Sequence, residues 1–321
     1  MKKKLVSIVI PCFNEVDNVN LIYLEIKNII KDYKESYNFE IIFIDNKSND
    51  GTREILREMS LHDKNVKLIF NARNFGVIKS PYHGLLSASG DACILLCADL
   101  QEPPELIVQF LMYWKEGFDI VAGVRDKPDD RIFIKFYKDC YYTILENFTS
   151  HPPIRNFTGF GLYSRKVLNI LKNLEDRNPF LRGIISQLGF PVKRVSYEFK
   201  YRVNGKTKNN YSVLYDYMLL GLMYHTKTPL RFIFISGLVI FFVSGLISII
   251  FLILKIINWD SYASGNIPIL LGVFMLGGLN MLFLGIVGEY LGYIISRMDK
   301  FPLVIEEERV NFENNDKLKK Y

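Results

Sequence analysis

Acidic, amide and basic side chains follow four short apolar runs in the first third of the chain. The four clusters are Pro11-Cys12-Phe13-Asn14-Glu15, Asp45-Asn46-Lys47-Ser48-Asn49-Asp50-Gly51, Arg73-Asn74-Phe75-Gly76 and Cys97-Ala98-Asp99-Leu100-Gln101-Glu102. Carboxylate and amide oxygens accept hydrogen bonds and are hard ligands for divalent metal ions. Turn and helix-capping roles would explain any one cluster, because Asn, Asp and Ser favour those positions. Four clusters in register predict instead a binding site for a polar ligand.

The segments between these clusters predict the scaffold that brings them together. Strands are expected at residues 6–11, 40–45, 66–70, 92–97 and 119–124, and helices at 17–34, 51–61, 77–89 and 104–115. Apolar strands that alternate with helices indicate an α/β fold with a mostly parallel sheet covered on both faces. In such sheets the ligand lies beyond the carboxyl ends of the strands, where all four clusters fall.

The ordered motifs PCFNE, DNKSNDGT, RNFG and ADLQEPPE resemble those of family 2 glycosyltransferases. Within that family the chain is similar to the dolichyl-phosphate mannose synthase and bactoprenol glucosyltransferase branch. The later segments Gly288-Glu289-Tyr290-Leu291-Gly292 and Phe301-Pro302-Leu303 match the bactoprenol type. The resemblance implies a GT-A catalytic domain over residues 1–210. It also implies inverting transfer of a sugar from a UDP- or GDP-linked donor onto undecaprenyl or another polyprenyl phosphate.

The resemblance also assigns roles to the clustered residues. Asp99 and Gln101 are expected to act in catalysis by holding Mg²⁺ or Mn²⁺, which neutralises the charge of the leaving diphosphate. The residues expected to bind the nucleotide sugar are Pro11, Glu15, Asp45 and Arg73. A purely structural role stays open for Asp99, as a helix N-cap, and for Asp45.

Basic residues further along the chain are candidates for binding the acceptor phosphate. They are Arg125, Arg131, Arg202, Lys206 and Lys208, with Lys135 close by. Arginine suits bidentate contacts to phosphate, and lysine attracts phosphate as a point charge. A solvated surface or a surface for lipid headgroups is the alternative explanation for each of them.

Two positions depart from the family pattern. Cys97 stands where relatives usually carry an Asp, and a thiol is a poor partner for a hard metal ion. Gly159 occupies the position of an Asp that is proposed as a base in many relatives. The acceptor is a phosphate monoester with a second pKa of about 6, so it is largely a dianion and requires no base. We expect the lipid phosphate to displace the nucleoside diphosphate in one in-line step.

The 321-residue chain is 49% hydrophobic, and most of its apolar excess lies between Phe232 and Leu291. The charge-free runs 232–254 and 267–288 each have about the 20 residues that a membrane helix needs, although buried core helices are the alternative. The positive-inside rule then places both termini in the cytoplasm. We therefore predict a multi-pass protein of the cytoplasmic (inner) membrane, with the catalytic domain in the cytoplasm.

The remaining segments follow from this arrangement. Residues 211–230 are predicted to form an amphipathic juxtamembrane segment, residues 231–292 the two spans, and residues 293–321 a cytoplasmic tail that is poorly ordered from Glu306 onward. Gly288 and Gly292 suit close packing of the spans or of subunits in a homo-oligomer, although glycine is also common in membrane helices. No nucleic-acid partner is expected, and the four cysteines have no metal-ligand spacing.

Two other functions compete with sugar transfer to a lipid phosphate. A processive polysaccharide synthase is disfavoured because neither Trp114 nor Trp259 lies in a Gln-x-x-Arg-Trp motif. A catalytically impaired scaffold that binds lipid or partner proteins is suggested by Cys97 and Gly159. The intact Asp45, Arg73, Asp99 and Gln101 favour an active enzyme. The sequence identifies neither the sugar nor the nucleotide.

Overall fold

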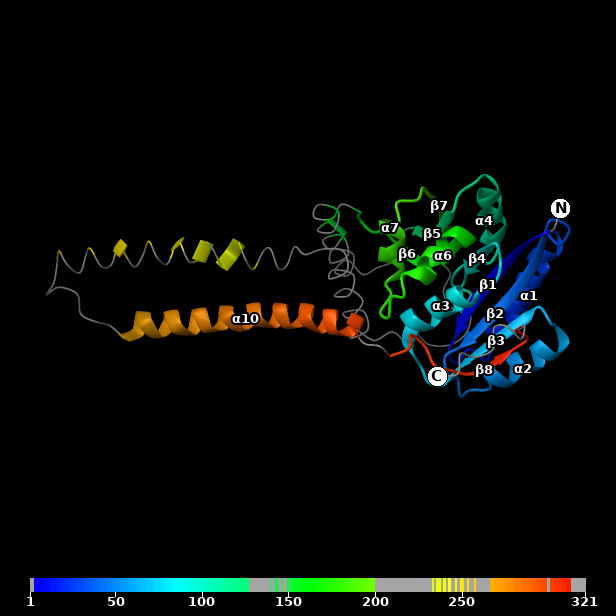
Figure 1. Ribbon diagram of the computed structural model, residues 1–321, viewed down its shortest axis with the longest axis horizontal. Coiled ribbons are helices and arrows are strands. Elements are labelled where there is room, and N and C mark those ends of the chain that lie inside the picture. Colours follow the sequence, from blue (N-terminus) through cyan, green and yellow to red (C-terminus); the bar gives the residue numbers. More distant parts are fainter. Residues whose placement is uncertain are drawn as a thin grey trace. The chain divides into compact units, whose positions relative to one another are not determined.

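The computed structural model describes residues 3–126, 151–199, 266–298 and 301–312, with single residues between 139 and 149 and between 233 and 257. The chain divides into two compact units. One unit comprises Met1–Tyr217 together with Asp299–Tyr321, and the other comprises Met218–Met298. The first unit holds the sheet and every strand that the structure describes (Figure 1).

The first unit is built on an eight-stranded mixed sheet with the order β7-β5-β6-β4-β1-β2-β3-β8. The strands are β1 (Lys4–Cys12), β2 (Tyr37–Asp45), β3 (Val66–Asn71), β4 (Ala92–Leu95), β5 (Ile120–Asp126), β6 (Phe157–Ser164), β7 (Val192–Glu198) and β8 (Glu306–Val310). Strands β1 to β4 pair in parallel, whereas β6 runs antiparallel to both β4 and β5. The carboxyl ends of β1 to β4 therefore lie along one edge of the sheet, which we call the carboxyl edge.

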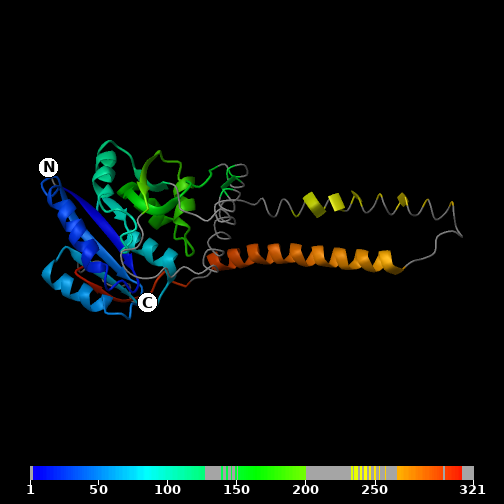
Figure 2. The ribbon, with the colours of Figure 1, turned by 180° about the vertical axis from the view of Figure 1, so that it is seen from behind.

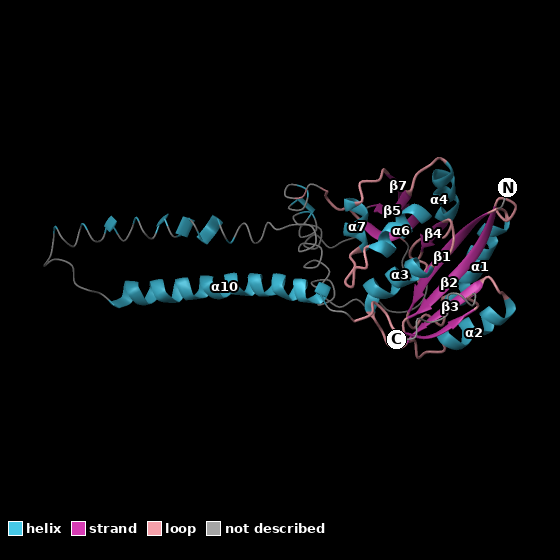
Figure 3. Cartoon of the chain, in the orientation of Figure 1, coloured by secondary structure: helices cyan, strands magenta, loops and turns pink. Residues whose placement is uncertain are grey.

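Helices cover both faces of this sheet (Figure 3). The described helices of the first unit are α1 (Val19–Lys31), α2 (Thr52–His62), α3 (Gly76–Ser87), α4 (Leu106–Lys115), α6 (Arg165–Asn173) and α7 (Leu181–Gln187). Helices α1 and α2 contact each other, as the view from behind shows (Figure 2), whereas α3 contacts α6. The strands and helices predicted over the first half of the chain are confirmed, with ends that differ by a few residues.

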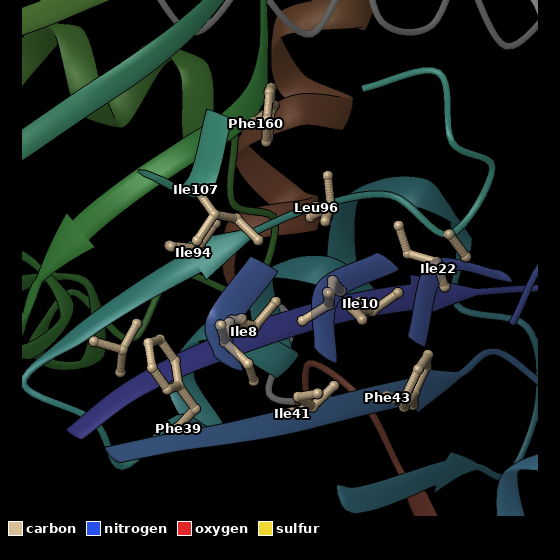
Figure 4. Close-up of a cluster of buried hydrophobic side chains, with 14 of the residues drawn as sticks. Ile8, Ile10, Ile22, Phe39, Ile41, Phe43, Ile94, Leu96, Ile107 and Phe160 are labelled. Carbon is tan, nitrogen blue, oxygen red and sulfur yellow. The ribbon is translucent and has the colours of Figure 1, made fainter. Parts of the chain in front are cut away.

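The core follows from the alternation of side chains along the strands. Ile8 and Ile10 of β1 point to the same face as Ile41 and Phe43 of β2, because every second side chain of a strand faces the same way (Figure 4). Helix α1 closes this face with Ile22, and all of these side chains are buried. Apolar burial of this kind contributes about 25 cal/mol per Å² and holds the strand ends in register.

The segment after residue 305 differs from the prediction of poor order. Residues Glu306–Val310 form β8, which pairs antiparallel with β3 at the edge of the sheet (Figure 1). The sequence of this strand is Glu-Glu-Glu-Arg-Val, so it has almost no apolar signal. Charged residues are common on edge strands, where they discourage pairing with further chains. Helix and sheet partners far away in sequence, rather than local pattern, explain why the strand forms.

The prediction of two membrane-spanning helices is wrong. Within the described residues, no helix combines the length and apolar character needed to cross a membrane. Only scattered residues of the run 232–254 are described, and the run 267–288 falls within α10 (Asn266–Met298). The prediction rested on the length, apolar composition and lack of charge of two sequence runs, whereas a span also needs a continuous helix of that length and hydropathy. The multi-pass membrane location rested on those spans and is corrected with them, while segment 211–230 lies outside the described residues.

Candidate functional site at the carboxyl edge

The loops after β1 and β2 are joined by hydrogen bonds. The backbone N–H of Asn14 donates to Ser48 Oγ at 2.8 Å, and the N–H of Asn49 donates to Asn14 Oδ1 at 2.9 Å. The N–H of Glu15 donates to Thr52 Oγ1 at 2.9 Å. Asn14 has a φ of 54°, in the left-handed region that asparagine tolerates better than most residues. These bonds hold the loop that carries Glu15 against the loop that follows Asp45.

Asp45 lies at the end of β2 and its side chain has no exposed surface. Arg53 of α2 neutralises it, with Nε 2.6 Å from Asp45 Oδ2. The N–H of Ser48 also donates to the carboxylate, at 3.2 Å from Oδ2. A buried carboxylate requires such a partner, because an unpaired buried charge costs several kcal/mol.

Asparagine side chains connect the ends of β2 and β3. Asn46 Oδ1 accepts from Asn71 Nδ2 at 3.1 Å and from the Phe75 N–H at 2.9 Å, while its Nδ2 donates to Asn74 Oδ1 at 2.8 Å. The exposed Arg73 follows in this loop, with its guanidinium carbon 4.2 Å from the centre of the Phe75 ring. Arg73 therefore lies at the same edge as Asp45, and its Nη1 donates to the Asn74 carbonyl at 3.3 Å.

The loop after β4 is organised around Glu102, a carboxylate that is almost fully buried. Glu102 Oε2 accepts from the Cys97 N–H at 3.0 Å, and Oε1 accepts from Thr158 Oγ1 of β6 at 2.8 Å. Burial raises the pKa of the Glu102 carboxyl to about 7, and the charge of Asp99 adds to that rise. The two hydrogen bonds act in the opposite direction. Glu102 thus anchors the loop that carries the predicted metal ligands.

Asp99 and Gln101 lie in this same loop. The Gln101 N–H donates to Asp99 Oδ1 at 3.3 Å, and Leu100 between them has a φ of 58°. Strand β4 ends at Leu95, so Cys97 lies in the loop and not on the strand, contrary to the prediction. Cys97 is partly exposed, whereas Cys93 is buried within the strand. The backbone of Gln101 and the carboxylate of Asp99 thus lie in one turn of the loop after β4.

Arg125 at the end of β5 carries an unsatisfied donor. Its Nε is buried and has no hydrogen-bond partner among the residues that the structure describes, while its guanidinium carbon lies 3.3 Å from the centre of the Phe199 ring. A buried donor without a partner costs about 1–3 kcal/mol, which makes this Nε a candidate for binding a ligand oxygen. The other predicted phosphate-binding residues lie outside the described part of the chain: Arg131, Lys135, Arg202, Lys206 and Lys208.

Gly159 on β6 has a φ of 106°, which L-residues with a side chain rarely adopt. A Cβ at this position would lie 3.6 Å from Leu181 Cδ2 and 3.8 Å from Leu95 Cδ2, which are ordinary contacts. The backbone and not the available space therefore favours glycine here. The Gly159 carbonyl accepts from Tyr163 Oη at 2.6 Å, which fixes this conformation further.

The comparison with known proteins decides the family. The profile of Glycosyl transferase family 2 matches residues 7–171, which contain all four polar clusters. The chain belongs to glycosyl transferase family 2. This family 2 glycosyltransferase is therefore an enzyme of sugar transfer, and its mixed α/β sheet is the GT-A-like fold that the resemblance implied.

Relatives of this glycosyltransferase align over nearly their whole length. The uncharacterized glycosyltransferase YkcC of Bacillus subtilis is 33% identical over 96% of this chain and 95% of its own. The prophage bactoprenol glucosyl transferase homolog of Escherichia coli K12 is 32% identical over 94% and 97% of the two chains. The bactoprenol glucosyl transferase of Shigella phage SfV is 32% identical over 95% and 99%.

The family implies a divalent metal ion. The residues of the loop after β4 show whether this chain has ligands that suit such an ion. Within the described residues, no group of three or more His, Cys, Asp or Glu side chains is arranged to hold a metal ion. Asp99 and Gln101 lie in one loop, and each carries a side-chain oxygen of the type that a hard metal ion takes as a ligand. Mg²⁺ commonly takes one or two carboxylates and completes its shell with substrate phosphates and water. The glycosyltransferase loop fits that mode of binding, in which the donor itself supplies ligands.

Sequence reasoning missed three residues that organise this edge. Arg53 pairs with Asp45, Thr158 pairs with Glu102, and Glu307 of β8 reaches Arg53. None of the three lies in a cluster of polar residues that pointed to ligand binding. Only Thr158 left a signal in the sequence. Glu102 lies between a candidate metal ligand and two prolines, and a carboxylate at such a position needs a hydrogen-bond partner. Contacts formed by tertiary structure alone account for the other two.

Proposed function

We propose that this protein transfers a sugar from a nucleotide-diphosphate sugar to a polyprenyl phosphate. Family membership supports the sugar transfer. The acceptor is supported by similarity over nearly the full chain to proteins named bactoprenol glucosyl transferase, since bactoprenol is a polyprenyl lipid. The observation that carries the proposal is the convergence of the polar clusters after β1 to β4 on one sheet edge. A ligand lies at this edge in sheets of this kind.

The proposed reaction is one displacement at the anomeric carbon. An oxygen of the acceptor phosphate forms the new bond to that carbon, and the bond from the same carbon to the nucleoside diphosphate breaks. The electron pair of the broken bond leaves with the diphosphate, so nucleoside diphosphate is released and the configuration inverts. The acceptor phosphate is largely a dianion above its second pKa of about 6, so no base has to remove a proton. Gly159 in place of an Asp is compatible with this chemistry.

The donor is proposed to bind along the ends of β1, β2 and β3. Arg73 is placed to stack on or bind the nucleobase, and the Asp45–Ser48 turn to meet the nucleoside. Asp99 and Gln101 would hold a divalent ion. When bound there, the ion would neutralise negative charge on the leaving diphosphate. Glu102 keeps that loop in place through its bonds to Cys97 and Thr158. Each of these side chains thus binds or orients the donor.

The acceptor phosphate is proposed to bind at Arg125. Its buried Nε, which has no hydrogen-bond partner among the described residues, offers a charged donor to a phosphate oxygen, and such charge-assisted bonds are about twice as strong as neutral ones. The Phe199 ring against its guanidinium holds the group in one orientation. Arg131, Arg202, Lys206 and Lys208 stay predictions for the same role.

The proposal is tested with the full-length chain in detergent. The chain is incubated with undecaprenyl phosphate, Mg²⁺ or Mn²⁺, and each of a panel of UDP- and GDP-sugars. Mass spectrometry then follows the lipid. We expect one donor to give a glycosylated lipid phosphate together with free nucleoside diphosphate, in a reaction that a chelator stops. A chain that binds the lipid but makes no product from any donor would favour the scaffold alternative.

A further inference from the structure

The C-terminal strand β8 reaches the loop after β2, although the two segments are far apart in sequence. Glu307 of β8 accepts from Arg53 Nη1 at 3.0 Å and from Lys47 Nζ at 2.8 Å, both at Oε2. Lys47 lies inside the loop that follows β2, and Arg53 lies in the first turn of α2 after that loop. One carboxylate from the last described strand thus contacts the Asp45-to-Gly51 loop at Lys47 and the start of α2 at Arg53.

Arg53 connects Glu307 to Asp45, because its guanidinium binds both carboxylates. Its guanidinium binds three acceptors at once, because Nε reaches Asp45 Oδ2 at 2.6 Å, Nη1 reaches Glu307, and Nη2 reaches the Asn71 carbonyl at 3.0 Å. The guanidinium is planar and rigid, so fixing two of its nitrogens fixes the third. Asp45 is fully buried and its position depends on this partner.

The loop itself needs external support. Lys47 adopts a φ of 67°, in the left-handed region that is unfavourable for a residue with a side chain. An ion pair from Lys47 to Glu307 holds this conformation in place. The loop conformation in turn sets the Ser48 N–H that donates to Asp45. Loss of Glu307 would therefore loosen the loop at Lys47 and remove one of the contacts that orient Arg53.

We propose that Glu307 is a positioning residue of the nucleotide-sugar site, which acts on Asp45 through Arg53 and Lys47. This inference rests on the proposed function, because it assumes that the Asp45 loop meets the donor. It makes the C-terminal strand a part of the donor site, although the matched family segment ends at residue 171. Glu307 touches no substrate in this account, and it changes donor affinity rather than the chemical step.

The neighbouring residue provides a matched control. Glu308 of β8 also pairs with an arginine of α2, because both of its oxygens meet the Arg57 guanidinium at 2.6–2.8 Å. The Glu307 and Glu308 side chains are similarly exposed, at 46% and 39%. No contact described for Arg57 reaches Asp45 or its loop. Glu307→Gln and Glu308→Gln therefore remove comparable surface ion pairs, and only the first reaches the donor site.

The experiment measures the Kd of UDP and GDP with Mg²⁺, and the donor KM and kcat with the donor that the product assay identifies. We expect Glu307→Gln to raise Kd and donor KM about three- to tenfold with kcat within about twofold, as suits loss of partly exposed charged contacts. Glu308→Gln should leave all three within about twofold. Arg53→Lys keeps the charge but loses the three-way geometry, so it should weaken binding more than Glu307→Gln does. Thermal unfolding confirms that the variants are folded.

Different outcomes separate the two proposals. Equal effects of Glu307→Gln and Glu308→Gln would overturn the positioning role, and so would unchanged binding in Arg53→Lys, while sugar transfer by the wild-type chain still stands. An Asp45→Asn variant that binds the donor as tightly as wild type would overturn the inference in the same way. Failure of the wild-type chain to bind any nucleotide or to make product would instead contradict the proposed function itself.

Discussion

Arg53 and Glu307 form an ion pair although they lie 254 positions apart in the chain. Nη1 and Oε2 are 3.0 Å apart, and the same guanidinium neutralises the buried carboxylate of Asp45. The carboxyl edge of the sheet is thus organised by its first strands and by its last one together. Residues outside the four polar clusters, Arg53 and Glu307, thus contact the Asp45 loop and hold it at this edge.

Replacement of Asp99 tests the metal-assisted departure of the diphosphate. Asp99→Asn removes the charge but keeps the shape, and we expect kcat to fall at least about 100-fold, as when one group that stabilises transition-state charge is lost. The rate is measured against Mg²⁺ concentration, and the variant should need more metal for half-maximal activity. Asp91→Asn is the control, because Asp91 lies before β4 at the opposite edge, where it accepts from the Leu5 N–H. Equal activity of wild type and Asp99→Asn would contradict the metal role.

Gly159 offers a test of whether the reaction lacks a base. Gly159→Asp places the residue of many relatives on a backbone with a φ of 106°, so we expect a loss of about 1–3 kcal/mol in the free energy of unfolding and no gain in kcat. Gly117→Ala is the control for strain alone, because its φ is 104° and nothing lies within 4 Å of its added Cβ. Higher kcat in Gly159→Asp would show that a base does assist the attack.

Replacement of Arg125 should change the KM for the acceptor lipid and not the KM for the donor. We expect Arg125→Ala to raise the KM for undecaprenyl phosphate about tenfold while donor KM stays within about twofold, because one charge-assisted contact to phosphate contributes about 1.5–3 kcal/mol at most. Steady-state kinetics with either substrate varied gives both constants. Arg194→Ala on the neighbouring strand β7 is the control, since Arg194 is exposed. A change in the donor KM alone would contradict the proposal that Arg125 binds the acceptor phosphate.

Acid should loosen the attachment of β8. Burial raises the pKa of Glu306, but hydrogen bonds from His83 and Arg309 outweigh it and lower the pKa from 4.5 to about 2. A lowered pKa means that ionised Glu306 stabilises the fold above pH 4.5, and this contribution is lost as the pH falls through about 2. Urea unfolding between pH 6 and pH 2 should therefore show wild type losing on the order of 1–3 kcal/mol more than Glu306→Gln. Parallel pH profiles for the two proteins would show that the carboxylate adds no stability.

The sequence predicts the centre of the sheet well and its edges poorly. Strands β1 to β5 are apolar runs between helices, and burial on both faces leaves a signal that local pattern can detect. Strand β8 is the opposite case, because its three glutamates are typical of a solvent-exposed tail. It forms because β3 offers backbone partners, and because α2 and α3 offer Arg57 and His83 to its carboxylates. Such long-range partners cannot be inferred from one local segment.

The candidate site shows the same division. Polar residues directly after apolar strands predicted a common edge, and the structure places Glu15, Asp45, Arg73 and Asp99 at the ends of four adjacent strands. The partners that fix them were not predicted, because Arg53 and Thr158 look like ordinary helix and strand residues. The membrane spans were predicted from two apolar, charge-free runs of about 20 residues, but no helix among the described residues is both long and apolar enough to cross a membrane. Side-chain pairing in three dimensions is the information that the sequence pattern lacked.

The central claim is that the acceptor phosphate attacks the anomeric carbon of the donor, and isotope labelling tests it most directly. Undecaprenyl phosphate that carries ¹⁸O in its phosphate is incubated with the full-length chain, the metal ion and the active nucleotide sugar. We predict a glycosylated lipid that retains all of the label, together with unlabelled nucleoside diphosphate, because the bond that breaks joins the sugar to the diphosphate. Release of nucleoside diphosphate without glycosylated lipid, or loss of label from the lipid product, would contradict the account.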